Sequence, residues 1–154
     1  MTRFQKTNRG RTRRRGATIV EFAYLLPVLL AILLGILESG WMVKNYLTLA
    51  NATRDGARAA AVGRSTSGVE TRIINLAKPL TVVSPNGNIV REYSIDDGVT
   101  YYAWPGDSAA GNNGVPAGRL LRITCTAKHR SLTGFFGPLA SPTLKIVVAM
   151  RREP

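Results

Sequence analysis

The longest apolar stretch of the chain covers residues 17–37, where Glu21 is the only charged residue. An α-helix needs about 20 consecutive apolar residues to cross the hydrocarbon core of a bilayer. Pro27 and Gly35 lie inside the stretch, and membrane helices tolerate both because neighbouring groups satisfy the freed backbone positions. The pattern predicts a single transmembrane helix over residues 17–38.

The helical pattern continues beyond this stretch. Over residues 39–63, apolar side chains recur three, four and seven positions apart, which is the spacing of one helix face. These residues are Val43, Tyr46, Leu47, Ala50, Ala57 and Ala61. Gly56 weakens a helix by about 1 kcal/mol without ending it, whereas Gly63 is a typical C-terminal stop. We expect an amphipathic helical extension over residues 39–63, with small residues suited to close packing. The continuous helix is then on the order of 70 Å long.

The pattern changes after this helix. Residues 69–80 predict a short amphipathic helix limited by Pro79. Alternating apolar and polar residues then predict strands over residues 80–84, 89–95, 99–104, 119–128 and 144–150. Asp97-Gly98 is a strong signal for a two-residue hairpin between the second and third strands. In the fourth strand, alternation places one apolar set on a single face, namely Leu121, Ile123, Cys125 and Ala127.

Together these elements predict an α+β fold. A long N-terminal transmembrane and stalk helix is followed by a small antiparallel β-sheet domain with a short packed helix. We expect the α+β domain to cover residues 64–154. The apolar stretch exceeds the 7–15 residues of a secretory signal peptide, and no small-residue cleavage site follows it closely. The sequence therefore favours an anchor that is not removed as a signal peptide.

Positive charge is concentrated at the N-terminus. The net charge is +12, and no acidic residue precedes Gly16. The basic residues of this head are Arg3, Lys6, Arg9, Arg11, Arg13, Arg14 and Arg15. By the positive-inside rule they keep the N-terminus cytoplasmic and place the α+β domain outside the cytoplasm. The arginines at positions 11 and 13–15 are the candidate determinants of this topology.

The same head explains the high isoelectric point. Without its seven basic residues, 14 basic residues remain against 9 acidic ones. A basic arm of this kind is also compatible with nucleic-acid binding, but charge alone does not establish a nucleic-acid interface. We therefore expect no nucleic-acid partner.

Cysteine and histidine are too scarce for most catalytic or metal sites. Cys125 and His129 are the only residues of their kinds, so neither an intrachain disulfide nor a cysteine-based zinc site can form within one chain. On a strand the two would lie about 13 Å apart, too far for a nucleophile and its base. We interpret Cys125 as a buried small hydrophobic residue and expect no catalytic residues and no cofactor.

Three aspartates and several aromatic residues are the remaining candidates for a metal site or a partner contact. Asp96, Asp97 and Asp107 lack the spaced acids of a calcium-binding loop, so we expect no metal. Phe135-Phe136 is a candidate partner contact, although core packing is the simpler interpretation. Either a surface contact or core packing is also open for the aromatic residues Tyr93, Tyr101, Tyr102 and Trp104.

The N-terminal half resembles a known family. The resemblance rests on three segments: GATIVEFAYLLPVLL, then LESGWMVKNYLTLANATRDGARAAAVG, and VVAMRRE at the end. They resemble the TadE-like minor pilins, or pseudopilins, of the tight-adherence (Flp) pilus system. The matching features are Gly16, Glu21-Phe22, Ala23, Pro27, Glu38, and residues 55–61 and 150–153. The resemblance is good over residues 14–63 and extends to the sheet region only in layout.

The resemblance implies processing and assembly. A membrane-embedded prepilin peptidase would cut between Gly16 and Ala17, removing residues 1–16 as a basic leader. Glu21 and Phe22 would serve peptidase recognition and assembly register. The implied partners are this peptidase, the major and other minor pilins, and the assembly platform in the bacterial inner membrane. The implied role is pilus assembly, initiation or capping, and through the pilus surface adhesion.

Glu21 has a physical explanation on this interpretation. A charge at membrane depth costs roughly 2.5–3.5 kcal/mol on insertion scales. Cleavage before Ala17 would create an α-amino group, which is cationic near neutral pH, and a carboxylate in the first turn also faces the positive end of the helix dipole. Glu21 would then pair with the amine of a neighbouring subunit when both leave lipid.

Simpler alternatives stay open. Glu21 lies only one turn inside the span, so its carboxylate could instead reach the headgroup region without any assembly role. The whole chain could also be a single-pass membrane-anchored binding module or periplasmic enzyme that uses the helix only as a tether. A basic-arm nucleic-acid binder is the third alternative.

Overall fold

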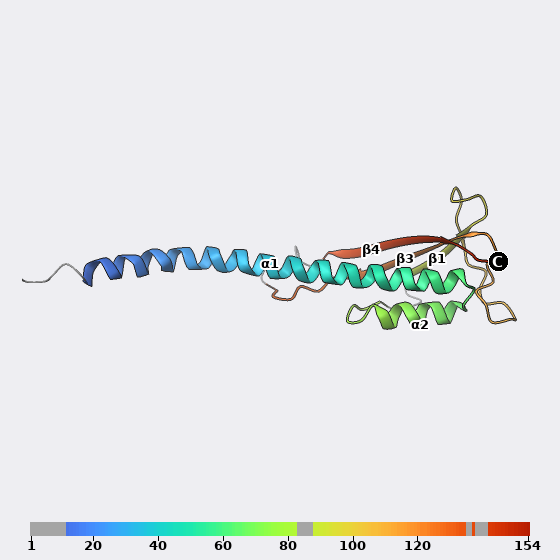
Figure 1. Cartoon of the computed structure of the whole chain (residues 1–154), viewed down its shortest axis with the longest axis horizontal. Coiled ribbons are helices and arrows are strands. Elements are labelled where there is room, and N and C mark those ends of the chain that lie inside the picture. The colour runs from blue at the N-terminus through green and yellow to red at the C-terminus, as the bar shows by residue number, and fades with distance from the viewer. Residues whose placement is uncertain (1–11, 83–87, 135–136, 138–141) are drawn as a thin grey trace, which may run out of the picture.

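The computed structural model describes residues 12–82, 88–134, 137 and 142–154, with side chains from residue 16 onward. Two helices precede four strands in the chain (Figure 1). The helices are α1 (Thr12–Ala61) and α2 (Thr66–Leu76). The strands are β1 (Ile89–Ser94), β2 (Tyr102–Ala103), β3 (Leu120–Lys128) and β4 (Thr143–Arg151). The predicted α+β fold is confirmed.

Helix α1 dominates the shape of the molecule. Its 50 residues give a length on the order of 75 Å at 1.5 Å per residue. The helix begins at Thr12, five positions before the expected start, because the arginines that follow are good helix formers. It ends where predicted: Gly63 has φ +84°, and its N–H bonds to the carbonyl of Ala60 at 3.0 Å. The N-terminal half of α1 projects from the domain, and the C-terminal half lies inside it (Figure 1).

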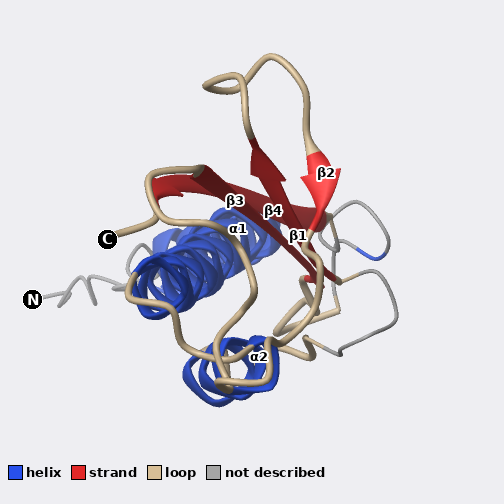
Figure 2. Ribbon diagram, turned by 90° about the vertical axis from the view of Figure 1, so that its right-hand side faces the viewer, coloured by secondary structure: helices blue, strands red, loops and turns tan. Residues whose placement is uncertain are grey.

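The four strands form one antiparallel sheet in the order β2-β1-β3-β4. The inner face of β3 carries the predicted apolar set, and all four residues are buried: Leu121, Ile123, Cys125 and Ala127. Helix α1 lies against this face, and α2 packs beside α1 (Figure 2). The core therefore lies between the sheet and the helix pair, and the outer face of the sheet is open to solvent.

Strand β4 runs alongside α1 and fastens the C-terminus to the end of the helix. The N–H of Glu153 donates to the carbonyl of Ala61 at 2.9 Å. Arg152 donates to the same carbonyl through Nη1 at 3.2 Å. Because this carbonyl belongs to the last turn of α1, it has no partner within the helix. The C-terminal residues thus complete the helix end.

Helix α2 is displaced from its predicted bounds. It begins three residues earlier than expected because Ser65 caps it: the Ser65 hydroxyl accepts from the N–H of Gly68 at 3.2 Å. It ends at Leu76, before the predicted limit at residue 80, and a turn follows in which the N–H of Leu80 donates to the carbonyl of Ala77 at 2.9 Å.

The first predicted strand is wrong in the part that the structure describes. Residues 80–82 form no strand, and residues 83 and 84 lie outside the described residues. Leu80 and Val82 are nevertheless buried in the core. The apolar residues were identified correctly, but they pack as an irregular segment leaving α2 rather than as part of the sheet.

The predicted two-residue hairpin is also wrong, although β1 and β2 do pair. Residues 95–101 separate the two strands. Asp97 and Gly98 adopt the positive φ values of a turn, +55° and +104°. Around them, side-chain hydrogen bonds take the place of backbone hydrogen bonds between strands. The Ser94 hydroxyl accepts from the N–H of Gly98 at 2.8 Å and donates to Asp96 at 2.6 Å. The hydrogen bonds from Ser94 and Thr100 hold the pKa of Asp96 well below its usual range.

The two helices approach closely at Gly56. A Cβ added there would overlap with Cγ1 and Cδ1 of Ile73 in α2, and Ile73 is fully buried in the core. By contrast, Gly40 in the same helix has nothing within 4 Å of an added Cβ.

We predict that Gly56→Ala destabilises the domain relative to Gly40→Ala, although both changes improve helix propensity equally. Overpacking a well-packed core costs typically about 1–3 kcal/mol, which outweighs the gain of about 1 kcal/mol in propensity. Urea unfolding of the full chain in detergent, followed by circular dichroism, measures the difference. Equal stability of the two variants would show that α2 can withdraw from α1 without loss.

Candidate functional site on the apolar helix

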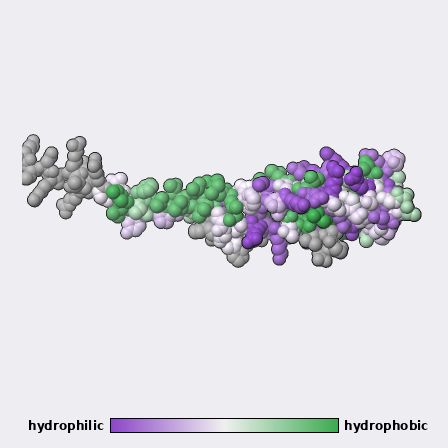
Figure 3. Space-filling view, turned by 90° about the horizontal axis from the view of Figure 1, so that it is seen from below, coloured by the Kyte–Doolittle hydropathy of each residue, from purple (hydrophilic) through white to green (hydrophobic). Residues whose placement is uncertain are grey.

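The projecting half of α1 carries apolar side chains that are largely exposed. The most apolar window of this helix has a mean hydropathy of 2.5 and no buried residue. The exposed large residues include Ile19, Val20, Phe22, Tyr24, Leu25, Leu29, Leu33 and Ile36. Figure 3 shows this apolar surface ending where the polar surface of the domain begins. Such a contiguous patch is far larger than soluble monomers expose.

Within the described residues, α1 is the one helix long and apolar enough to cross a membrane. A helix of this kind needs lipid around it, or the apolar surfaces of other protein chains. The uncovered surface is therefore consistent with a single membrane anchor, and it is the candidate functional site.

The predicted processing and register residues lie at the start of this surface. Gly16, Ala17, Glu21 and Phe22 are all helical and exposed. Ala17 and Glu21 are four positions apart, so they lie on the same face of the helix. Among the described residues, no basic side chain forms an ion pair with Glu21. Arg11 and the side chains of the arginines at 13–15 lie outside the described part of the chain.

The exposed apolar surface continues into the stalk. Val43, Tyr46 and Leu47 are about half exposed. Ala57 and Ala60 of the same helix are buried in the core. The small residues that were expected to suit close packing thus contact their own sheet and α2. The exposed side chains of Val43, Tyr46 and Leu47 are therefore available for contacts with other molecules.

A buried polar cluster marks the level where the apolar stretch ends. Glu38, Asn45 and His129 are each less than a tenth exposed. The Glu38 carboxylate accepts from the N–H groups of Leu132 at 3.0 Å and Thr133 at 3.2 Å. It also accepts from the Thr133 hydroxyl at 3.1 Å. Glu38 therefore fastens the segment after β3 to α1.

His129 joins this cluster from the other side. The amide Nδ2 of Asn45 lies 3.0 Å from His129 Nδ1. An amide nitrogen only donates, so Nδ1 accepts in this arrangement. Nε2 lies 3.5 Å from Oε1 of Glu38. The imidazole is thus oriented between two helix side chains, and it positions the end of β3 against α1.

The sequence analysis named Glu38 and His129 but not Asn45, and it did not predict that the three residues associate. Glu38 was noted only as a matching feature, and His129 only in relation to Cys125. One signal was available, because Glu38 and Asn45 are seven positions apart and so share a helix face. The contact of that face with residues 129–133 is long-range, and no local pattern reveals it.

Cys125 is the buried small hydrophobic residue that the sequence predicted. It is 0% exposed and belongs to the core behind β3. Burial raises the pKa of its thiol, and a hydrogen bond with Thr53 opposes the shift. A buried thiol with a raised pKa is a poor nucleophile.

The three aspartates weighed as metal ligands each have a protein partner. Asp96 accepts from Ser94 and Thr100, Asp97 pairs with Arg151 at 2.8 Å, and Asp107 accepts from the N–H of Thr66 at 2.6 Å. Each carboxylate therefore has a contact within the domain.

The aromatic residues of the sheet are also partly engaged. The rings of Tyr93 and Tyr102 lie 6.0 Å apart. The guanidinium of Arg122 lies 3.3 Å from the centre of the Tyr101 ring, and the Trp104 indole donates to the carbonyl of Glu92 at 2.9 Å. Phe135-Phe136 lies outside the described residues.

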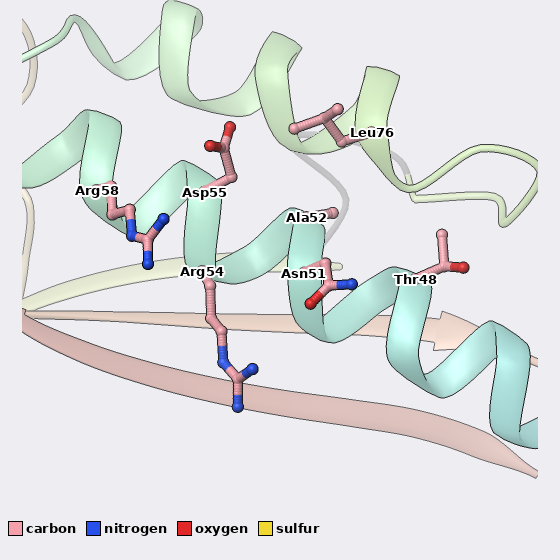
Figure 4. Close-up of a pocket in the computed structure, with 7 residues that line it drawn as sticks. All are labelled: Thr48, Asn51, Ala52, Arg54, Asp55, Arg58 and Leu76. Carbon is pink, nitrogen blue, oxygen red and sulfur yellow. The ribbon is translucent and has the colours of Figure 1, made fainter.

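A groove of about 520 Å³ lies between α1 and α2 (Figure 4). Asp55 points from α1 toward α2, where it pairs with Arg72. This hydrogen bond with Arg72 lowers the pKa of Asp55. Arg54 points away from α2 (Figure 4). Asp55, which lines the groove, is therefore held in an ion pair that joins the two helices.

An exposed apolar helix joined to a small α+β domain is consistent with the class of single-pass membrane-anchored proteins. Within that class, the family model described as TadE-like protein matches residues 16–58. The predicted resemblance is thereby confirmed for the apolar helix and most of the stalk. The family is associated with Tad pilus biogenesis and is generally non-enzymatic. No curated protein and no solved structure matches the chain.

We predict that Glu38→Gln destabilises the domain by about 1–3 kcal/mol, the cost of leaving buried hydrogen-bonding groups imperfectly paired. The amide would present donors to the N–H groups of Leu132 and Thr133, so their hydrogen exchange should accelerate selectively. Exchange measured by mass spectrometry on the full chain in detergent detects the change. Glu153→Gln is the control, because that side chain is exposed. Unchanged exchange at 132–133 would contradict the assigned role of Glu38.

We also predict that the folded chain resists alkylation of Cys125 by iodoacetamide at pH 8. Reaction should be at least about ten-fold slower than in the urea-unfolded chain, since the thiolate is both scarce and inaccessible. Intact mass measurement follows the adduct. Rapid stoichiometric labelling of the folded chain would reopen the assignment of Cys125 as a reactive residue.

Proposed function

We propose that the chain is a minor pilin or pseudopilin of a tight-adherence pilus, matured by prepilin peptidase and acting in pilus assembly, initiation or capping. The observation that carries the proposal is the uncovered apolar helix bearing Gly16 and Glu21, in a region that matches the TadE-like family. This helix supplies a packing surface both for lipid and for neighbouring subunits. The proposal includes contacts with major and other minor pilins and with the inner-membrane assembly platform.

The helix surface suits transfer from lipid to a bundle of helices. Its large apolar residues lose little when lipid contacts are replaced by protein contacts, because both environments are apolar. Glu21 differs from them, since an unpaired carboxylate in lipid costs roughly 2.5–3.5 kcal/mol. Pairing with the new α-amino group at Ala17 of a neighbour removes much of that cost. The carboxylate would then fix the axial register between subunits.

The domain supplies a second kind of contact. Its position outside the cytoplasm follows from the basic head, and its acidic groups are engaged in loops and ion pairs rather than gathered around a cavity. A structural role therefore fits better than catalysis. A membrane-tethered binding module remains the rival, and it would need neither cleavage at Gly16 nor register at Glu21.

The first test is the N-terminus of the chain purified from cells that carry the pilus system. We expect it to begin at Ala17, because the peptidase would cut after Gly16. Mass spectrometry of the N-terminal peptide measures this directly. A chain that retains residues 1–16 would defeat the proposal and leave the tethered module as the better explanation.

The second test is Glu21→Gln, which removes the charge but keeps the size of the side chain. We expect normal cleavage and membrane insertion, but at least about ten-fold less chain in sheared pilus fractions, since roughly 1.4 kcal/mol corresponds to each factor of ten. Quantitative immunoblotting of membrane and pilus fractions measures the ratio. Asp97→Asn is the control, because it removes an exposed carboxylate of the domain whose surface pair contributes little. Equal incorporation of both variants would defeat the register role alone.

A further inference from the structure

A cleft of about 500 Å³ opens at the end of the domain nearest the apolar helix. We infer that this cleft binds the phosphate headgroup of an anionic phospholipid in the leaflet from which the domain emerges. Its lining includes Trp41, Asn45, Lys128, Arg130 and Leu132. We call these five residues the foot of the domain. The inference rests on the membrane anchoring in the proposed function, but it requires neither cleavage nor assembly into a pilus.

The height of the foot matches the headgroup layer. Trp41 follows the last residue of the apolar stretch, Leu37, by four positions, which is about 6 Å along a helix. The headgroup region adds roughly 5–7 Å on each side of the hydrocarbon core. Tryptophan is also a residue that concentrates at this depth. The cleft therefore faces lipid headgroups rather than bulk water when α1 spans the bilayer.

The charge of the foot suits a phosphate. Lys128 and Arg130 are exposed, and Lys44 lies with its ammonium 4.4 Å from the centre of the Trp41 ring. The described lining of the cleft contains no acidic residue. The nearest carboxylate, Glu38, is buried and accepts hydrogen bonds from residues 132 and 133. Positive charge is therefore presented without local neutralisation.

The foot also has an apolar edge that is held in place. Leu132 is 56% exposed, although its N–H is fixed to Glu38 at 3.0 Å. The Trp41 indole donates to the carbonyl of Arg130 at 3.3 Å. Two helix side chains thus hold the segment that carries both the charge of Arg130 and the exposed leucine. At headgroup depth this leucine would contact the upper acyl chains.

Asn45 contributes to the inner wall of the cleft and is not a direct headgroup ligand. Its amide nitrogen contacts His129, and its Oδ1 is buried, with no hydrogen-bond partner among the described residues. The exposed groups of the foot are therefore the cations and Leu132. Phosphatidylglycerol carries a negative phosphate and no positive charge, so it is the lipid probe of choice.

The chain offers a matched control for charge. Arg54 and Arg58 are also exposed, but they lie 17 and 21 positions beyond Leu37, about 25–30 Å along the helix. They are out of reach of the headgroups. Arg54→Gln with Arg58→Gln therefore removes the same charge as Lys128→Gln with Arg130→Gln, but away from the membrane surface.

The test uses the full chain in nanodiscs of phosphatidylcholine with one-fifth phosphatidylglycerol. Native mass spectrometry after release from the disc measures which lipids stay bound. We expect retained phosphatidylglycerol to be enriched over its share in the disc. In the Lys128→Gln/Arg130→Gln variant, the ratio of retained phosphatidylglycerol to retained phosphatidylcholine should fall roughly five-fold per removed charge, as expected for basic residues at an anionic surface. The Arg54→Gln/Arg58→Gln variant should retain the enrichment.

A second measurement separates this inference from the proposed function. In a Trp104→Phe background, Trp41 is the remaining tryptophan, and lipids brominated near the headgroup should quench its fluorescence. Quenching without phosphatidylglycerol enrichment would overturn the inference and leave membrane anchoring intact. Absence of quenching would overturn both. Equal loss in the two double variants would overturn the headgroup site. So would equally tight binding of soluble glycerol phosphate in discs of phosphatidylcholine alone, since the site would then be a general phosphate site.

Discussion

A single continuous helix has to satisfy two different environments, and the rest of the structure depends on that constraint. The first half of α1 carries large apolar side chains that no part of the described chain covers. The second half carries alanines such as Ala57 and Ala60, which let the sheet and α2 approach closely. Because the backbone is helical throughout, the domain and the anchor share one axis. The change of side-chain size along the helix therefore decides where the uncovered apolar surface ends and the protein core begins.

The buried carboxylate of Glu38 lies at the boundary between these two environments. A buried charge is unfavourable unless it is hydrogen-bonded, and Glu38 is surrounded by donors from residues 132 and 133. Satisfying Glu38 therefore specifies where the chain must return to α1 after β3. His129 and Asn45 complete the arrangement by fixing the end of that strand. At the end of the domain nearest the apolar helix, polar contacts thus determine how the chain packs against α1. In the interior of the domain, apolar packing does so.

Much of this architecture follows from local patterns. The apolar stretch, the stop at Gly63 and the alternation in β3 predicted elements that the structure contains, because burial imposes a period on each of them. The hairpin at Asp97-Gly98 was misjudged because Ser94 and Asp96 compete with the strand ladder for backbone groups. Leu80 and Val82 were misjudged because burial alone does not distinguish a strand from an irregular segment. Gly16 and Glu21 stand out through their spacing from the apolar stretch, whereas the Glu38 cluster joins residues more than 80 positions apart, which no local period encodes.

The domain is fastened to α1 at both of its ends, and this has a mechanical consequence. The C-terminal residues bond to the carbonyl of Ala61, and at the opposite end Glu38 holds the segment that follows β3. A force along the helix axis would therefore be shared between the two sets of contacts instead of acting on one end of the domain alone. A domain built in this way can transmit tension from its anchor to whatever it contacts without unravelling from the end of the chain.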